Sequence, residues 1–332
     1  MPARIRELIV GTVTVLLGCR GDLLSVGDPG NLVPRTVAED PSLPAIDVNG
    51  TRLHAETAGT PGRPMVVVVH GGPGADYRYL LRCRELADSG FFVVFYDQRG
   101  TGLSRREPRG GYSVAVMVAD LAAVIGHYRV GPEQPVFLLG HSWGGILATA
   151  FIERSPDAAT GVILAEPGGF TWPDIEDYVA RARRFSPLSE TLNDAAWLDR
   201  ILSAGREDHA AADYQLGLLA YTDGATDSPL GDDGAVPFWR AGAVTNQALF
   251  DIGRRDRPDW TAGAAGYSPP VLFLYSERNR AYGAGHAERV ASAYPNVTIE
   301  LVRDAGHDLF TFAAGWRNAM PLVVAYLRSR AR

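Results

Sequence analysis

Short apolar runs alternate with stretches of helical spacing along most of the chain. The apolar runs are rich in β-branched and aromatic residues and lie at 65–69, 91–96, 136–139, 162–165, 271–275 and 297–302. Such runs predict strands that are buried on both faces of a parallel sheet. Between them, apolar residues recur at steps of three and four, as in 114–125, which predicts helices. The alternation predicts right-handed βαβ crossovers and an α/β fold with a doubly wound, mostly parallel sheet.

Two stretches depart from this alternation. The pair Asn49-Gly50 separates two alternating runs within 46–54, which predicts an antiparallel hairpin at the start of the fold. Between 168 and 266 no strand-like run occurs, and the helical spacing is interrupted by prolines. We interpret 168–266 as a helical cap that is inserted between two core segments, 44–167 and 267–332.

Most of the tryptophans fall in the predicted cap. They are Trp172, Trp197, Trp239 and Trp260, four of the six in the chain. Ligand sites in open α/β sheets lie at the carboxyl ends of the strands, where this cap would sit. Each tryptophan is therefore expected either to pack inside the cap or to line an apolar pocket above the sheet.

The N-terminal residues are not predicted to belong to the folded domain. Arg4 and Arg6 precede an apolar stretch at 8–17, which is typical of a signal peptide over 1–19. The stretch is too short to span a bilayer, which needs about 20 apolar residues. Its ending, Leu16-Leu17-Gly18-Cys19, resembles the lipobox of bacterial lipoproteins. That resemblance implies an exported protein held at the membrane by a lipid on Cys19.

Other interpretations of the N-terminus remain open. One is a plain secretory signal, which would give a secreted or periplasmic protein; another is an amphipathic helix with a buried Cys19. Residues 20–43 are rich in Gly, Pro and Asp, which predicts a linker. Cys83 lies in a periodic stretch and is expected to be a buried, inert helix residue.

Composition narrows the range of partners. The 332 residues are 46% hydrophobic and carry a net charge of −6, values that are ordinary for a folded domain. No basic run with interleaved aromatics occurs, so nucleic acid is an unexpected partner.

A candidate nucleophile lies between a predicted strand and a predicted helix. The sequence there is Gly140-His141-Ser142-Trp143-Gly144, a G-x-S-x-G pattern. In such an elbow the backbone of the serine is strained, and a side chain at either flanking glycine would collide with neighbouring chain. Ser142 is therefore expected to expose its hydroxyl, with free N–H groups of the following helix beside it.

A glycine-rich loop follows the first buried strand. It reads His70-Gly71-Gly72-Pro73-Gly74. Its glycines allow the backbone to approach a ligand, and the N–H of Gly72 can join that of Trp143 to form an oxyanion hole. The alternative is a tight structural loop in which His70 is packed and hydrogen-bonded.

A candidate base follows the last predicted strand, in Asp304-Ala305-Gly306-His307-Asp308. A histidine on a loop at this edge of the sheet can reach the elbow serine as general base. His141 adjoins the serine, but its side chain is expected to point away. The other histidines fall at positions more consistent with packing or the surface.

These motifs together resemble the α/β-hydrolase superfamily, nearest its proline iminopeptidase branch. They are HGGPG at 70–74, the segment Asp97-Gln98-Arg99-Gly100-Thr101-Gly102-Leu103-Ser104, the Ser142 elbow and Gly306-His307. The resemblance covers about 46–167 and 268–332, and it implies an α/β-hydrolase fold with an inserted cap. Asp97 and Arg99 are expected to brace loops beneath the site.

The triad acid departs from the pattern of that branch. Its members usually carry an Asp shortly after the penultimate strand, where this chain has Asn279. A neutral amide cannot stabilise the imidazolium of His307, and in a serine protease the equivalent change lowers turnover about 10⁴-fold. Two carboxylates could replace it. Glu277 lies on the same loop, and Glu166 ends the strand that follows the nucleophile helix, where some α/β-hydrolases place their acid.

We favour Glu166, because a charge that ends an apolar strand is costly without a partner. The alternative roles are a helix cap or a salt bridge for Glu166, and a solvated loop position for Glu277. If neither carboxylate reaches His307, the enzyme would be severely impaired.

The predicted function is a serine hydrolase that forms an acyl-enzyme on an ester or amide and needs no metal or cofactor. Ser142 argues against epoxide hydrolase or dehalogenase chemistry, which in this superfamily uses an Asp at that position. The favoured substrate is a peptide with N-terminal proline, followed by a small ester or lactone. An aminopeptidase would need a cap carboxylate for the substrate's amino group, and the candidates are Glu176, Asp177, Glu190 and Asp213. The alternative from another class is a lipid-anchored binding protein that hydrolyses its small ligand slowly or never.

Overall fold

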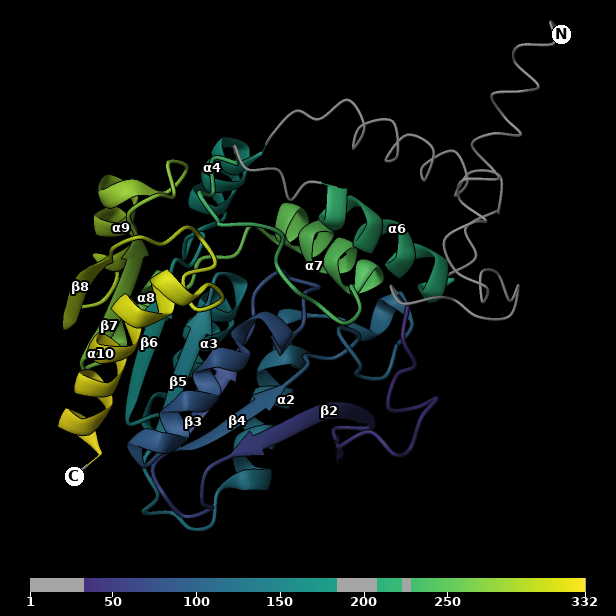
Figure 1. The fold of residues 1–332 in the computed structure, drawn as a ribbon, viewed down its shortest axis with the longest axis horizontal. Coiled ribbons are helices and arrows are strands. Elements are labelled where there is room, and N and C mark those ends of the chain that lie inside the picture. Colours follow the sequence, from purple (N-terminus) through teal and green to yellow (C-terminus); the bar gives the residue numbers. More distant parts are fainter. Residues whose placement is uncertain (1–32, 184–207, 223–227, 332) are drawn as a thin grey trace, which may run out of the picture. The chain divides into compact units, whose positions relative to one another are not determined.

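A computed structural model describes residues 33–183, 208–222 and 228–331 (Figure 1). An eight-stranded sheet has the order β1-β2-β4-β3-β5-β6-β7-β8, in which β3 to β8 are parallel to one another and β1 and β2 are antiparallel to their neighbours. The strands are β1 (Ala45–Val48), β2 (Thr51–Ala58), β3 (Met65–Val69), β4 (Phe92–Tyr96), β5 (Val136–His141), β6 (Gly161–Ala165), β7 (Val271–Ser276) and β8 (Val297–Val302). The predicted fold class is confirmed.

Helices cover both faces of the sheet. One face is covered by α2 (Val114–Tyr128), α3 (Trp143–Arg154), α8 (Thr261–Gly266) and α9 (Gly283–Ala291), and the other by η1 (Tyr77–Ser89) and α10 (Ala313–Arg330). Short 3₁₀ turns are η2 (Arg109–Gly111) and η3 (Pro156–Ala158). Successive residues of β3 alternate between the two cores: Val67 packs with the first set of helices and Val68 with the second. Every residue of β3 is buried, as expected for a strand covered on both faces.

The first hairpin has the predicted turn. Asn49 and Gly50 have φ values of 46° and 73°, and Val48 pairs with Thr51 across the turn. Positive φ at both central residues is the conformation that Asn-Gly favours. Cys83 lies in η1 and is fully buried, as predicted, and burial raises the pKa of its thiol.

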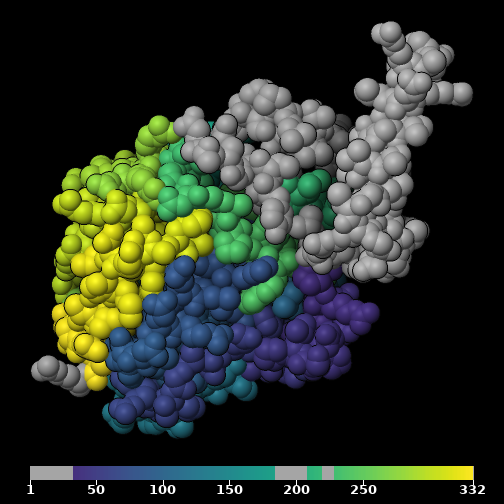
Figure 2. All heavy atoms as spheres, viewed as in Figure 1, coloured from purple at the N-terminus to yellow at the C-terminus, as the bar shows by residue number. Residues whose placement is uncertain are grey.

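The cap lies above the carboxyl ends of the strands (Figure 1). Its described helices are α4 (Trp172–Ala182), α6 (His209–Thr222) and α7 (Ala243–Asp256). The chain enters and leaves the cap side by side, since the Trp172 N–H donates to Pro258 O at 3.0 Å and the Trp260 N–H to Phe170 O at 2.8 Å. The predicted cap extended to residue 266, but α8 packs on α3 of the core. Figure 2 shows green cap atoms in direct contact with the core on this face.

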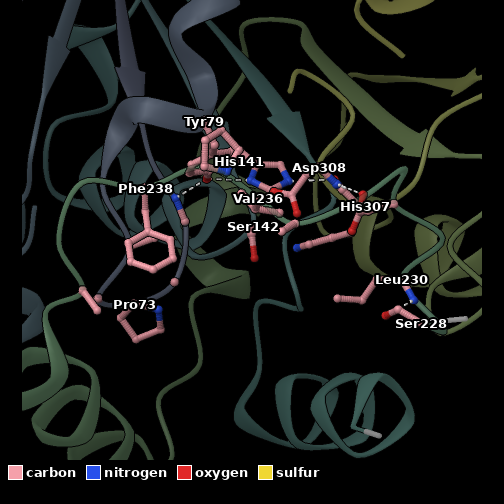
Figure 3. Close-up of a pocket in the computed structure, with 18 of the residues that line it drawn as sticks. Pro73, Tyr79, His141, Ser142, Ser228, Leu230, Val236, Phe238, His307 and Asp308 are labelled. Atoms are coloured by element: carbon pink, nitrogen blue, oxygen red, sulfur yellow. Dashed lines mark hydrogen bonds between the residues drawn. The ribbon is translucent and has the colours of Figure 1, made fainter. Parts of the chain in front are cut away.

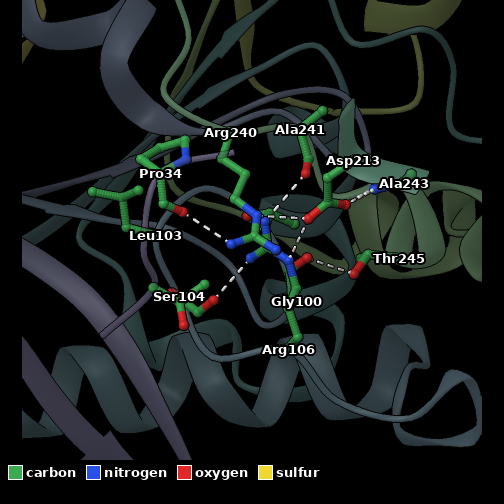
Figure 4. Close-up of polar contacts among 12 residues, drawn as sticks. Pro34, Gly100, Leu103, Ser104, Arg106, Asp213, Arg240, Ala241, Ala243 and Thr245 are labelled. Carbon is green, nitrogen blue, oxygen red and sulfur yellow. Dashed lines mark hydrogen bonds and ion pairs between the residues drawn. The ribbon is translucent and has the colours of Figure 1, made fainter. Parts of the chain in front are cut away.

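A buried charge cluster ties the cap to the rest of the fold (Figure 4). Asp213 of α6 accepts from Arg106 Nε at 2.9 Å and from Arg240 Nε at 2.8 Å. Its other oxygen accepts from the Ala243 N–H at 2.9 Å, at the start of α7. Arg240 also donates to Pro34 O at 2.9 Å. One carboxylate therefore joins two cap helices to a core loop and, through Arg240, to the N-terminal segment.

The linker predicted over 20–43 differs from the structure in its second half. Val37 is 1% exposed, and its N–H donates to Leu103 O at 2.8 Å, so the first part of 33–43 packs on the core through its buried residues Val33, Thr36 and Val37. Residues 20–32, the predicted signal peptide 1–19 and Cys19 lie outside the described residues. Of the helices that the structure describes, none has the length and apolarity needed to cross a membrane.

Candidate active site

The elbow between β5 and α3 has the strained geometry that its glycines predict. Ser142 has φ 52° and ψ −122°, and its N–H donates to Ala165 O at 2.8 Å. A Cβ added to Gly144 would lie 1.9 Å from Val69 O, and one added to Gly140 would lie 2.5 Å from Gly144 O. The Ser142 hydroxyl makes no capping hydrogen bond to α3, although the residue occupies the N-cap position. The hydroxyl is thus presented to the cavity above the sheet.

The two predicted oxyanion donors lie beside Ser142. Gly72 and Ser142 line the same two cavities, and Trp143 lines the second of them. Within the described part of the chain, neither the Gly72 N–H nor the Trp143 N–H donates to a protein acceptor. Gly72 has φ +118°, and a Cβ there would lie 2.5 Å from Gly74 N, so this backbone requires glycine.

His307 lies on the loop after β8 and pairs with Glu166. The distance from His307 Nδ1 to Glu166 Oε2 is 2.8 Å, and Glu166 is fully buried. Glu166 directly follows β6 with φ 44°, a backbone conformation that costs energy for a non-glycine residue. Among the described residues, the His307 ring makes its hydrogen bonds through Nδ1, with Glu166 and with Tyr178. Nε2 therefore has no protein partner among the described residues, and the ring lines the same cavity as Ser142 (Figure 3).

The remaining lone pairs of Glu166 are satisfied by three donors. Oε1 accepts from the Ser276 N–H at 2.7 Å and from the Ser276 hydroxyl at 2.6 Å. Oε2 accepts from Asn279 Nδ2 at 2.7 Å. Asn279, at the position where the resemblance implies an acid, thus supplies a donor to a carboxylate on the neighbouring strand.

Glu277, the alternative acid, lies away from His307. Its Oε2 accepts from the Asp304 N–H at 2.9 Å, a contact between exposed groups. The loop that follows β7 therefore directs Glu277 towards solvent and Asn279 towards Glu166. Of the two candidate carboxylates, only Glu166 reaches the histidine.

The charge on His307 is set by burial and by three neighbouring carboxyl groups. Burial opposes the imidazolium, but the hydrogen bond and charge of Glu166, with the charges of Asp308 and Asp232, outweigh it and raise the pKa of His307 to about 9. Burial and the charge of Asp308 raise the pKa of Asp232 to about 8. Burial likewise raises the pKa of Asp308. The Asp232 and Asp308 carboxyls interact with each other, so ionisation of both at once is disfavoured.

His141 has a structural position, as predicted. Its Nε2 lies 2.8 Å from His307 O, which can only accept, so Nε2 carries the proton. Its Nδ1 then accepts from the Tyr79 hydroxyl at 2.8 Å, and the Tyr79 oxygen accepts from the Gly71 N–H at 2.7 Å. Burial keeps the pKa of His141 well below its usual value, so the ring is neutral. The chain of contacts links the oxyanion loop, the elbow and the His307 loop.

Two cavities meet at Ser142. The larger, of about 400 Å³, is lined by Tyr79, Asp232, His307 and Asp308 together with residues 71–75 and 234–238. The smaller, of about 90 Å³, is almost wholly apolar, and Trp172 and Trp260 are among its lining residues. Two of the cap tryptophans therefore line an apolar pocket at the serine. Trp239 packs instead on His54 and Tyr77, and Trp197 lies outside the described residues.

A family model described as the alpha/beta hydrolase fold matches residues 64–314. The chain belongs to this family. A stretch of 103 residues is 39% identical to epoxide hydrolase A of Mycobacterium tuberculosis, over 31% of each protein. Another of 100 residues is 34% identical to the proline iminopeptidase of Thermoplasma volcanium, over 30% of this chain and 33% of that protein. The matches span about a third of the length of these curated relatives.

Solved structures extend the likeness to the whole fold. A proline iminopeptidase-related protein from Thermus thermophilus is 25% identical, with a TM-score of 0.59 over 86% of this chain and 97% of that chain. An esterase from Thermogutta terrifontis is 23% identical, with a TM-score of 0.56 over 87% and 98%. The chain is therefore an α/β-hydrolase whose curated relatives include epoxide hydrolases and proline iminopeptidases, and it shares its fold with an esterase.

The carboxylates that line the cavity of this α/β-hydrolase are not the cap carboxylates named from sequence. Glu176 and Asp177 pair with exposed arginines, Asp213 is held in the buried cluster, and Glu190 lies outside the described residues. Asp232 and Asp308 line the cavity instead. Asp308 is next to His307 in the sequence, so its place at the site could have been predicted from its neighbour. Asp232 lies in a loop with no motif, so only the fold brings it to the site.

No group of three or more His, Cys, Asp or Glu side chains in the described ranges is arranged to hold a metal ion. Asp97 and Arg99 lie beneath the site, as expected. Asp97 contacts His54 Nδ1 at 2.8 Å and accepts from the Leu103 N–H, and Arg99 pairs with Asp120. These contacts hold the loop after β4 against the hairpin and α2.

Proposed function

We propose that this α/β-hydrolase is a serine hydrolase that acts through an acyl-enzyme on an ester or amide bond. The observation that carries the proposal is the His307–Glu166 pair on the same cavity as a Ser142 hydroxyl that makes no capping bond. A nucleophile, a base and a group that orients the base are the parts this chemistry requires.

The steps follow from the geometry. Nε2 of His307 takes the proton of the Ser142 hydroxyl as its oxygen attacks the substrate carbonyl carbon, and the Gly72 and Trp143 N–H groups donate to the oxyanion. His307 then protonates the leaving group as the carbonyl re-forms. Water attacks the acyl-enzyme with His307 again as base, and Ser142 regains its proton. Glu166 stabilises the imidazolium in both halves of the cycle.

For the substrate we propose a peptide with N-terminal proline. Support comes from the likeness to proline iminopeptidases and from the Asp232–Asp308 carboxyl pair, which lines the cavity of Ser142 and could hold a protonated amine. A small ester or lactone is the second candidate, favoured by the smaller pocket, where none of the described lining residues carries a carboxylate. Epoxide hydrolysis is disfavoured, because a serine occupies the nucleophile position.

A fluorophosphonate probe tests the catalytic proposal. Labelling of the wild type and its loss in Ser142→Ala would support it, whereas an unlabelled wild type that still binds small ligands would favour a non-catalytic binding protein. A panel of prolyl arylamides, their N-acetylated forms and short acyl esters then separates the substrates. Prolyl arylamides should be cleaved and N-acetylated ones spared, and preferential cleavage of esters would favour the second candidate.

We also propose that the protein is exported and anchored through a lipid on Cys19, on the basis of its lipobox-like sequence. Cys19→Ala and wild type would be compared by cell fractionation. The variant should leave the membrane fraction, and continued membrane association would show that acylation of Cys19 is not the anchor.

A further inference from the structure

Tyr178 belongs to the cap helix α4, yet its hydroxyl contacts the core histidine. The Tyr178 oxygen lies 3.0 Å from His307 Nδ1 and 3.3 Å from Asn279 Nδ2. Tyr178 is 6% exposed, and its ring centroid lies 5.8 Å from that of His307 and 5.3 Å from that of Tyr282. A residue of the inserted segment is thus in contact with the same nitrogen that Glu166 holds.

The protons of this cluster can be assigned from its acceptors. Both oxygens of Glu166 already accept hydrogen bonds, from Ser276 and from Asn279, so Nδ1 of His307 supplies the proton in its contact with Oε2 and shares it with the Tyr178 oxygen. Asn279 Nδ2 donates to the same two oxygens. Burial, with the nearby charge of Glu166, raises the pKa of Tyr178 well above its usual value, so the hydroxyl stays neutral.

Tyr178 also lines the smaller, apolar pocket together with Ser142. A substrate group in that pocket contacts the tyrosine ring whose hydroxyl holds the His307 ring. His307 is therefore held by a residue of the cap as well as by the core, and that cap residue also lines the apolar pocket.

We propose that Tyr178 is a positioning residue that makes the orientation of His307 depend on the packing of cap helix α4. The proposal rests on the proposed function, because His307 is taken as the base. Substrates that fill the apolar pocket should then gain in kcat, since they hold the tyrosine against the imidazole.

Several groups that titrate or carry charge face His307. They are Glu166 at the end of β6, Asp308 on its own loop, Asp232 on the loop before α7, His141 of the elbow at a ring distance of 4.7 Å, and Tyr178. The neutral Tyr178 hydroxyl stabilises the imidazolium as an acceptor. Its removal should lower the pKa of His307 and move the rising limb of the pH profile to lower pH.

The test compares Tyr178→Phe with Tyr267→Phe. Tyr267 is also fully buried and loses one hydrogen bond, to Ala159 O at 3.0 Å, but it lines neither cavity. Tyr178→Phe should lower kcat for a short acyl ester about tenfold, the effect of one hydrogen bond to a charged group, and shift the pH profile. Tyr267→Phe should leave both unchanged. The downfield proton resonance of His307 Nδ1–H should move in Tyr178→Phe alone.

Wild-type kcat and an unshifted profile in Tyr178→Phe would overturn the proposal. So would a loss of kcat with an unshifted profile and an unmoved Nδ1–H resonance, because that would indicate a merely structural role. The resonance does not depend on turnover. A wild type that the fluorophosphonate fails to label would therefore refute the proposed function, while the contact between Tyr178 and His307 is still judged by the spectrum.

Discussion

Glu166 is a fully buried carboxylate whose partners come from the end of β7, the loop after it and the loop after β8. Its donors lie on Ser276, Asn279 and His307. A buried charge without such partners would cost several kcal/mol, which explains why a strained φ of 44° is tolerated there. The site therefore depends on the identity of this one side chain.

Glu166→Gln should lower kcat by a few orders of magnitude, since the analogous change in a serine protease costs about 10⁴-fold. The amide keeps the shape of the side chain but removes the charge that stabilises imidazolium at His307. Turnover of an ester or prolyl arylamide measures the effect. Glu277→Gln is the matched control and should keep wild-type turnover; equal losses in both variants would contradict the assignment of Glu166.

The raised pKa of His307, about 9, predicts the pH dependence of the enzyme. Below this pH the ring is protonated and cannot accept the Ser142 proton, so kcat/KM should rise with pH up to about 9. Asp308→Asn removes a negative charge that favours imidazolium, so the rising limb should move to lower pH. Asp233→Asn, which alters an exposed partner of Arg278, should leave the limb in place. A limb that stays in place in Asp308→Asn would contradict this account.

Helices α4 and α7 of the cap meet at Gly253. A Cβ added there would lie 2.1 Å from Cζ3 of Trp172, whose ring also lines the apolar pocket. The glycine lets the tryptophan ring approach the backbone of α7 closely, and this ring forms part of the pocket wall. Packing between these two helices is thus part of the binding site.

Gly253→Ala should lower the free energy of unfolding by about 1–2 kcal/mol, measured by urea denaturation. Alanine gains up to about 1 kcal/mol in helix propensity, but the overpacking against Trp172 costs about 1–3 kcal/mol. KM for substrates with an apolar acyl group should rise as the pocket changes shape. Gly126→Ala in α2, where a Cβ meets no atom within 4 Å, should be neutral or stabilising; destabilisation of both variants alike would argue against the clash.

The Asp213 cluster joins parts of the molecule that are far apart in the sequence (Figure 4). Asp213→Asn would leave Arg106 and Arg240 buried without the carboxylate they share. We expect a loss of about 3 kcal/mol in the free energy of unfolding, which is typical of a broken buried ion pair. Asp251→Asn, which alters exposed ion pairs with Arg109 and Arg254, should cost about 0.5 kcal/mol or less for each pair. Similar losses in the two variants would show that burial is not what makes the cluster matter.

The fold was predictable because its signals are local. The β-branched runs, the Asn49-Gly50 turn and the glycines of the elbow each act within a few residues. The segment 33–43 differed from the expected linker because its polar composition hid two buried valines, Val33 and Val37. Burial of single residues in a polar segment depends on what lies across from them, which the sequence does not display.

The site was predictable only in part, for the same reason. Ser142, Gly72 and His307 follow strand ends and carry motifs. The choice between Glu166 and Glu277 depended on which loop turns inward, and Asp232 and Tyr178 come from a cap without any motif. Contacts between separate insertions are decided by packing in three dimensions.

The contact between Asn279 and Glu166 also limits the evolutionary routes open to this site. Positions 166, at the end of β6, and 279, on the loop after β7, can each place one carboxylate beside His307. The Glu166 Oε2 and Asn279 Nδ2 atoms lie 2.7 Å apart. An evolutionary change that moves the acid between positions 166 and 279 must pass through a protein with both carboxylates or with neither. Two carboxyls at this distance must share a proton, and with none the imidazolium is unsupported. Asn279→Asp, which restores an acid at the position usual in the related branch, should therefore lower kcat rather than raise it. Asn279→Asp combined with Glu166→Gln should recover part of the activity that Glu166→Gln alone loses.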